Sequence, residues 1–309
     1  MFKLVVPDLI SNSYFPAIAA IDLGFFKEEG LDVELELLFP VNKSYEALRD
    51  GSVAFVAGSA HSALAAFPNW DGVKLVCAQG QGMYWYLVMD KAHNPRRLDL
   101  DCVKGKKIGA APWVEMGLRR MLIAAGYDLE RDDITIMPVP GAAGGQPSVN
   151  FGLMAADALQ AGKIDGFWAN GVGTQVALNS GVGDIIVDVR RREGPAEAFN
   201  FTMASIATSD AVLADNPGLA EATVRAMNKT HAALKEDPKR AQDVANKRFP
   251  AEQAALIVPL IERDLPAYST GISENFVAGM NQFCSDLGLL TSPVAYTDVV
   301  AEAAIPLWT

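Results

Sequence analysis

Hydrophobic and polar residues alternate along the first part of the chain in a pattern that predicts strands followed by helices. Val33, Leu35 and Leu37 are separated by glutamates, which is the period-two pattern of a strand with one buried face. A short apolar strand is predicted over residues 53–57, and it leads into small residues among which Ser59 can cap the next helix. Such a junction leaves backbone N–H groups available to an anion or a polar ligand head.

The same alternation extends over most of the chain. Strands are predicted at residues 2–6, 33–37, 53–57, 73–78, 84–89, 106–110, 134–139, 164–168, 185–189 and 201–207. The helices between them are predicted at residues 13–29, 45–49, 59–67, 112–125, 151–161 and 171–180. Because residues 106–189 repeat the pattern of residues 2–78, we expect two α/β units with parallel sheets and helices on both faces.

A polar stretch at residues 90–101 marks the expected crossing into the second domain. Beyond Ser209 the pattern is helical, with helix starts predicted near residues 216, 237, 250 and 273. A helical tail cannot form a sheet of its own, so it is expected to pack on the first domain. The predicted domains are therefore residues 1–89 with 205–309, and residues 90–204.

Charge and composition narrow the function classes. The formal net charge is −11, which argues against nucleic acid or an anionic membrane surface as the main partner. No apolar run approaches the length of about 20 residues that a membrane span needs. A strand-like segment follows Met1 directly, so we expect either a cytoplasmic protein or one whose leader is absent from this sequence.

The sequence offers little for metal or nucleophilic chemistry. Cys77, Cys102 and Cys284 are widely spaced and form no CxxC pair, so they are expected to be buried apolar residues rather than disulfides or zinc ligands. The glycine-rich run at residues 141–145 lacks the lysine and hydroxyl of a phosphate loop, and we interpret it as a rim loop. We expect no metal, no cofactor and no catalytic residue.

Five segments in register carry a resemblance to a known family. They are GFFKEEGLDVEL (24–35), ALRDGSVAFVAGS (47–59), GKKIGAAP (105–112), ALQAGKIDGFWAN (158–170) and SDAVLADNPGLAEATVRAMNKTHAAL (209–234). With them the chain resembles the substrate-binding proteins of the nitrate/sulfonate/taurine class of ABC importers, also called the NMT1/THI5-like family. The resemblance covers nearly the whole chain.

The resemblance implies a type II periplasmic-binding-protein fold. In this fold two α/β lobes are joined by two crossover strands, expected here near residues 87–90 and 203–207, and hinge closure traps the ligand in the cleft between them. The family also includes enzymes: a pyrimidine synthase of thiamine biosynthesis, a sulfinate desulfinase and decarboxylase-like proteins. This sequence lacks the cysteine-rich motif of the synthase, and no Cys stands near the end of the first strand, where the desulfinase has its nucleophile.

Ligand groups in this fold come from loops at the carboxyl ends of strands. That rule selects Asn12, Ser13, Tyr14, Ser59, Ala60, His61, Tyr84, Trp85, Trp113, Val114, Glu115, Trp168, Asn170 and Thr202. The aromatic members suit a planar or aliphatic body, and the predicted helix starts favour an anionic head. We therefore expect a small organic anion, such as an aromatic carboxylate or a sulfonate. A cationic or neutral heteroaromatic ligand held by Glu115 and the rings stays open.

Several side chains have a structural interpretation beside the functional one. His61 is either a ligand donor, a structural group or an acid/base partner of Glu115. His93 and His231 are expected at the surface. The run at residues 190–192 is expected to be solvated, or to steer an anion.

Three functions remain on sequence grounds. The first is a receptor of an ABC importer, expected to be a monomer that binds a small molecule and docks on a permease. Such a receptor is expected to be periplasmic, or anchored to the membrane on its extracytoplasmic side, although a cytoplasmic location stays open. The alternative is a cytosolic enzyme acting on an aromatic or heterocyclic acid, decarboxylase-like or related to thiamine pyrimidine synthesis. A sensor without a transport partner is a third.

Overall fold

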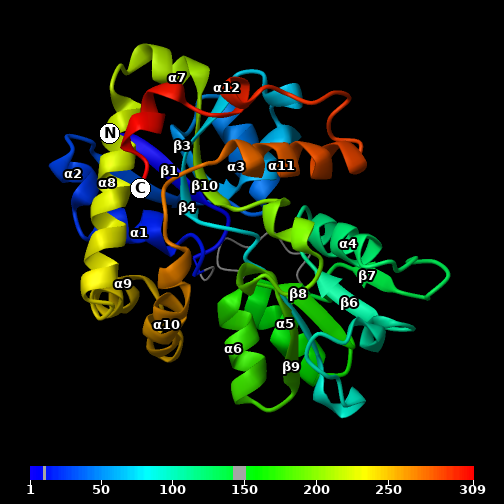
Figure 1. Ribbon diagram of the computed structural model, residues 1–309. Helices are drawn as coiled ribbons and strands as arrows, with labels where there is room; N and C mark the ends of the chain where they lie inside the picture. The colour runs from blue at the N-terminus through cyan, green and yellow to red at the C-terminus, as the bar shows by residue number, and fades with distance from the viewer. Residues whose placement is uncertain (10–11, 142–150) are drawn as a thin grey trace. The chain divides into compact units, whose positions relative to one another are not determined.

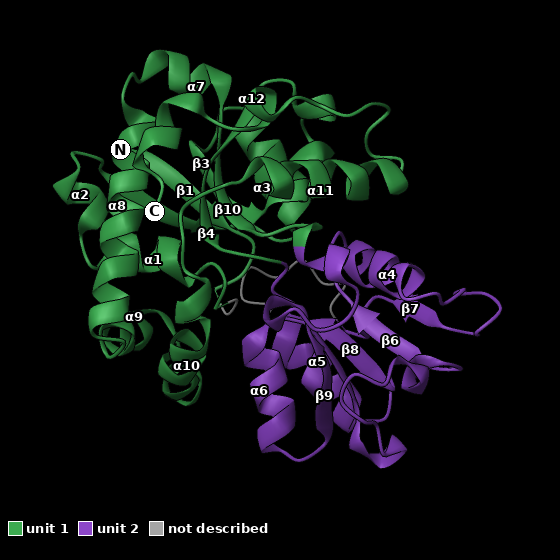
Figure 2. Cartoon of the chain, in the orientation of Figure 1, with its two compact units in different colours: residues 1–82, 200–309 green, residues 83–199 purple. Residues whose placement is uncertain are grey.

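The computed structural model describes residues 1–9, 12–141 and 151–309. These residues form two compact units, which are residues 1–82 with 200–309 and residues 83–199 (Figure 2). The sequence analysis placed the boundaries somewhat later, after residues 89 and 204. The chain thus passes between the units twice, and the two passages are joined where the Met83 N–H donates to the Phe199 carbonyl oxygen at 3.0 Å.

The first unit is built on a five-stranded sheet whose order is β2-β1-β3-β10-β4. Its strands are β1 (Phe2–Val6), β2 (Val33–Leu37), β3 (Phe55–Ser59), β4 (Val73–Gly80) and β10 (Ala204–Ser209). Neighbours β2, β1 and β3 are parallel, whereas β10 runs antiparallel to both β3 and β4. The sheet is therefore mixed, not parallel as predicted, because the returning strand inserts between two strands from the start of the chain.

Helices cover both faces of this sheet. Figure 1 shows α1 and α8 packed together on one side and α3 on the other. The helices are α1 (Phe15–Asp22), α2 (Phe25–Glu28), α3 (Val41–Arg49), α7 (Asp210–Asp215), α8 (Leu219–Glu236), α9 (Arg240–Arg248), α10 (Ala251–Asp264), α11 (Glu274–Asp286) and α12 (Tyr296–Val299). The predicted single helix over residues 13–29 is wrong, because Gly24 adopts a φ of 84° and separates α1 from α2.

The tail beyond Ser209 is helical, as predicted, and belongs to the first unit. Pro250 and Ser273 are the N-caps of α10 and α11, which confirms two predicted helix starts. At its end the chain lies along β4: Val300 bridges to Leu75, and the Trp308 ring N–H donates to the carbonyl oxygen of Val76 at 2.9 Å.

The second unit repeats the arrangement with the order β7-β6-β8-β5-β9. Its strands are β5 (Tyr86–Asp90), β6 (Lys107–Ala110), β7 (Thr135–Met137), β8 (Gly166–Ala169) and β9 (Gly183–Asp188). Strand β5 runs antiparallel between β8 and β9. Since β5 is hydrogen-bonded into this sheet, residues 83–89 belong with the second unit.

Three helices complete the second unit: α4 (Glu115–Ala124), α5 (Phe151–Gln160) and α6 (Gly171–Asn179). Phe167 of β8 packs into the cluster that α5 and α6 cover, whereas Trp168 points to the opposite face and donates to the Val114 carbonyl oxygen at the start of α4. Short 3-10 helices fill the remaining turns: η1 (Ala60–Ala65), η2 (Pro68–Trp70), η3 (Lys91–His93), η4 (Leu100–Val103), η6 (Val189–Arg191), η7 (Ala196–Asn200), η8 (Leu265–Ala267) and η9 (Glu302–Leu307).

Candidate functional site

The selected residues lie at one edge of each sheet. In the first sheet β3 ends at Ser59 opposite Ala204, where β10 begins. In the second sheet β8 ends at Ala169 opposite Tyr86, where β5 begins. Both edges are the carboxyl edges of the parallel strands, which is where α/β sheets bind their ligands. Each edge is described below within its own unit.

At the first edge the structure brings His61 and Thr202 together. Both are fully buried, and the His61 Nδ1 lies 3.0 Å from the Thr202 Oγ1. The His61 backbone N–H also donates to this hydroxyl oxygen, at 3.4 Å. The Thr202 hydroxyl can donate to Nδ1 or accept from it, depending on the His61 tautomer. Phe283 of α11 meets the His61 ring edge-on, with the centroids 5.4 Å apart.

The expectation of free backbone N–H groups after Ser59 is wrong for two positions. The Ala60 N–H donates to the Met203 carbonyl oxygen at 3.0 Å, and the His61 N–H is taken by Thr202. Ser59 caps nothing, because its hydroxyl lies 2.6 Å from that of Ser62. The segment just before β10 thus accepts the hydrogen bonds of the backbone N–H groups that were expected to bind a ligand. The sequence could not reveal this, because the partners are about 140 residues away.

The loop after β1 supplies two further buried polar residues. The Asn12 side chain donates to the carboxylate of Asp264 at the end of α10. Ser13 is 2% exposed, and its hydroxyl has no hydrogen-bond partner among the described residues. The N-cap of α1 is Tyr14, so the helix begins later than the predicted start at residue 13. Ser13 therefore stands at the carboxyl edge as a buried hydroxyl that no described residue engages.

Sequence analysis missed two residues at this edge. Asp264 is fully buried and far from Asn12 in the chain, so no local pattern pointed to it. Gln79 stands one residue beyond the predicted strand at residues 73–78, but it lies in β4, accepts from the Ala17 N–H at 3.2 Å and donates to the Ser205 carbonyl oxygen at 3.1 Å. Both residues hold the edge in place.

At the second edge three aromatic rings are in contact. The Tyr84 and Trp85 centroids are 5.0 Å apart, and those of Trp85 and Trp168 are 6.1 Å apart. The guanidinium carbon of Arg190 lies 5.6 Å from the Tyr84 centroid. The rings and the cation together offer an apolar surface next to a positive charge.

The turn between β6 and α4 is strained. Trp113 has a φ of 71°, a conformation that a bulky residue rarely adopts. Such strain costs about 1–3 kcal/mol and is concentrated at functional sites. Here it turns the chain so that Val114 accepts the Trp168 ring N–H at 3.1 Å and α4 begins at Glu115.

Two polar atoms at this edge are buried without a partner. They are the Glu115 Oε2 and the Asn170 Oδ1, and neither has a hydrogen-bond partner among the described residues. Burial raises the pKa of the Glu115 carboxyl above its usual value, while backbone N–H groups of Glu115 and Trp113 and the charge of Arg119 act in the opposite direction. Asn170 is the N-cap of α6 but makes no side-chain capping bond.

Thiol chemistry is not favoured at either edge. Burial raises the pKa of the Cys77 and Cys284 thiols strongly, and burial also raises that of Cys102, to about 11. Within residues 1–9, 12–141 and 151–309 no group of His, Cys, Asp and Glu side chains could hold a metal ion. Among the described helices none is long and apolar enough to cross a membrane.

The surface predictions for the histidines and arginines are partly corrected. His93 is exposed and lies 3.0 Å from Asp165, whereas His231 is 3% exposed and stacks on Tyr268. In the predicted basic run, Arg190 and Arg192 lie over the rings of Tyr84 and Phe199. Residues 142–145 of the predicted rim loop lie outside the described residues.

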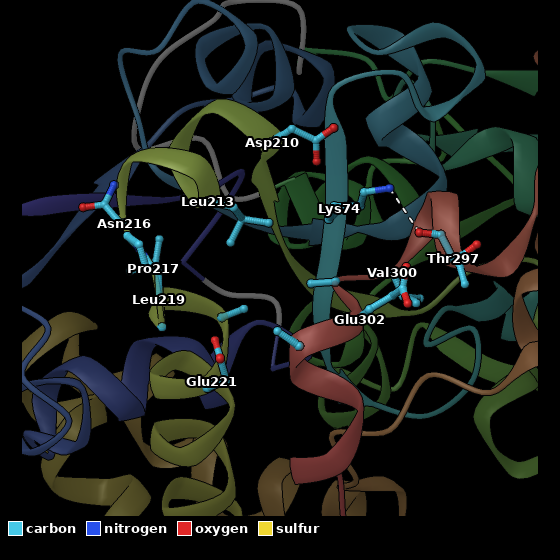
Figure 3. Close-up of a pocket in the computed structure, with 14 residues that line it drawn as sticks. Lys74, Asp210, Leu213, Asn216, Pro217, Leu219, Glu221, Thr297, Val300 and Glu302 are labelled. Carbon is cyan, nitrogen blue, oxygen red and sulfur yellow. Dashed lines mark hydrogen bonds between the residues drawn. The ribbon is translucent and has the colours of Figure 1, made fainter.

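A separate cavity of about 330 Å³ lies at the other edge of the first sheet, near the start of β4 (Figure 3). Acidic side chains line it, namely Asp210, Glu221 and Glu302. Its lysine, Lys74, already donates to the carbonyl oxygens of Thr297 at 3.1 Å and Asp298 at 2.7 Å. This cavity therefore does not fit an organic anion.

The two mixed sheets, with their flanking helices and paired chain crossings, form a two-lobed α/β fold. The model of the family described as NMT1/THI5 like matches residues 11–241, and the chain belongs to this family. Family and fold class are thus as the sequence predicts. No curated protein matches the chain.

Solved structures share this fold at low sequence identity. The periplasmic aliphatic sulphonate binding protein SsuA from Escherichia coli is 13% identical with a TM-score of 0.70, covering 97% of this chain and 96% of its own. The periplasmic nitrate-binding protein NrtA from Synechocystis PCC 6803 is 14% identical with a TM-score of 0.68, covering 98% and 86%. The desulfurization enzyme DSZB is 15% identical with a TM-score of 0.63, covering 97% and 96%. Binding proteins and an enzyme thus share the architecture.

Proposed function

We propose that this protein is the solute-binding receptor of an ABC importer and that it captures a small organic anion with an apolar body. The observation that carries the proposal is a set of buried polar atoms at the carboxyl edges that have no hydrogen-bond partner among the described residues. Ser13, Glu115 and Asn170 each hold such an atom there. A buried polar group without a partner costs about 1–3 kcal/mol, and a bound ligand that supplies the partner removes that cost.

The surroundings of these atoms set the expected ligand class. The Tyr84, Trp85 and Trp168 rings suit an aromatic or aliphatic body, and Arg190 adds a cation beside them. The fold shared with sulphonate- and nitrate-binding proteins agrees with an anionic head. We infer an aromatic carboxylate or a sulfonate, bound as the lobes close. We also infer that the protein works outside the cytoplasm, with an ABC permease as its partner.

A thermal-shift screen tests this proposal. Benzenesulfonate, benzoate and short alkanesulfonates are added to the protein, and recovery of the unchanged compound is checked by mass spectrometry. A ligand at 100 times its dissociation constant adds about 2.7 kcal/mol to the free energy of unfolding. A compound that is bound and returned intact supports a receptor. A compound that is consumed points to the enzyme, and no stabilisation by any anion contradicts the anion class.

The variant Trp113→Gly tests the site. Glycine accepts the φ of 71° without strain, so the free protein is expected to keep its melting temperature while the ligand-induced shift falls. Leu98→Gly is the matched control, because Leu98 also has a positive φ, 67°, in the same unit and is 59% exposed. Equal ligand shifts in the two variants would remove Trp113 from the site.

A further inference from the structure

Glu115 is an unusual residue to find at the edge of an anion site. It is the first residue of α4, and its buried Oε2 has no hydrogen-bond partner within residues 1–9, 12–141 and 151–309. No ion pair to this carboxyl occurs among the described residues. The ionised carboxylate carries a larger desolvation penalty in such a place than the neutral acid does.

The neighbours of Glu115 do not remove this penalty. On α4 itself the charged residues are Arg119, one turn further on and exposed, whose charge acts on the carboxyl, and Arg120, which is half-buried. The segment that packs on α4 at Gly117 contains Met83 and Trp85, with Tyr84 as its titratable group, and Arg190 lies over the Tyr84 ring. Strands β7 and β8 contain no titratable residue. Gly194 lies against Met121 of α4, and its neighbour Glu193 forms an ion pair with Arg97 at 2.7 Å.

The carboxyl is therefore placed to hold a proton on the oxygen that lacks a partner. Backbone N–H groups of Trp113 and Glu115 interact with the carboxyl, and the unpartnered Oε2 is left as the position for an O–H donor. The raised pKa of Glu115, caused first by burial, agrees with this assignment.

We propose that Glu115 acts as a neutral carboxylic acid that donates its hydrogen bond to the anionic ligand, so that the receptor takes up an organic anion together with one proton. The inference rests on the proposed receptor function and deepens it. It excludes a cationic ligand, which would require the ionised carboxylate. It also makes affinity depend on pH: binding weakens, by up to about tenfold for each pH unit, as the pH rises through the pKa of Glu115.

Calorimetry with benzenesulfonate and benzamidine between pH 5 and 8 tests the proposal, because these probes share a ring and carry opposite charges. For the wild-type protein we expect benzenesulfonate to bind more weakly as the pH rises. Glu115→Gln imitates the neutral acid, so this variant is expected to bind benzenesulfonate with little dependence on pH and more tightly than the wild type at pH 8. Glu130→Gln removes an exposed carboxylate of the same unit and is expected to keep the wild-type pH profile.

The opposite results would overturn the inference. They are benzamidine binding that strengthens with pH and is lost in Glu115→Gln, benzenesulfonate binding that ignores pH in the wild type, or a Glu115→Gln protein that does not fold. A carbon-13 NMR titration of the side-chain carboxyls measures the pKa of Glu115 in the free protein. The Glu115 signal is assigned by its absence from the Glu115→Gln spectrum. If benzenesulfonate does not bind at any pH, the anion class of the proposed function fails, and a Glu115 signal that titrates in the ordinary range separately refutes the neutral acid.

Discussion

His231 lies in the interior of the first unit, where its ring stacks on Tyr268 with the centroids 4.8 Å apart. Burial, and to a lesser degree the charge of Lys235, lowers the pKa of His231 to about 3. The folded state therefore holds this imidazole neutral at pH values where the unfolded chain already binds a proton. A group of this kind makes folding sensitive to acid.

We predict that the free energy of unfolding decreases as the pH falls below about 6.5, at up to about 1.4 kcal/mol per pH unit for this group. The direction follows because the unfolded His231 takes up its proton first. His231→Phe keeps an aromatic ring and removes the titration, so its stability relative to the wild type should rise between pH 6.5 and 4.5. Urea unfolding across that range measures the difference. A constant difference would mean that His231 does not control the acid sensitivity.

At the scale of single residues, sequence reasoning found the types of site residue but not their partners. Trp168, Asn170 and Glu115 were selected because they follow strands. That Trp168 donates to Val114, or that Thr202 takes the His61 N–H, depends on contacts between distant segments. His231 was misplaced for the same reason, since a histidine in a helix looks alike whether it faces water or Tyr268.

At the scale of elements, local patterns predicted the bounds of elements that have one buried face. They did not predict where the chain turns. The alternation of Val33, Leu35 and Leu37 predicted β2 exactly where it lies, at Val33–Leu37. The break at Gly24 was not predicted, because apolar residues continue across it. The 3-10 helix after Ser59 was predicted as an α-helix, because small residues can begin either kind of helix.

The crossing of α5 and α6 depends on two glycines. A Cβ atom added at Gly173 would overlap the backbone of Gly152, and a backbone cannot move aside as a flexible side chain can. We predict that Gly173→Ala lowers the free energy of unfolding by about 1–3 kcal/mol through overpacking. Gln175→Ala, on the same helix but half-buried, is the control and should change it by less than about 0.5 kcal/mol. Denaturant titration of both variants checks this, and equal midpoints would contradict it.

At the scale of the molecule, the order of strands sets which part can fold alone. All five strands of the second sheet come from residues 83–199, without interruption. The first sheet needs β10, which lies between β3 and β4 but comes from the returning chain. The two units therefore differ in what each requires from the rest of the sequence.

We predict that a fragment of residues 83–199 folds cooperatively, whereas a fragment of residues 1–82 does not. Joining residues 1–82 to 200–309 by a short glycine–serine linker should restore folding, because the crossings lie close together at Met83 and Phe199. Circular dichroism during urea titration of the three chains is the measurement. Cooperative unfolding of residues 1–82 alone would show that β10 is dispensable for the first sheet.

The place of β10 also has a consequence for synthesis on the ribosome. The chain emerges from its amino end, so β1 to β4 appear early but cannot close their sheet until Ala204–Ser209 has followed. The second unit is complete before that point and can fold while the first still waits, since domains fold as units during translation. The first residues to be made thus belong to the sheet that is completed last. Until β10 has been made, the apolar strands β1 to β4 remain exposed and are open to aggregation.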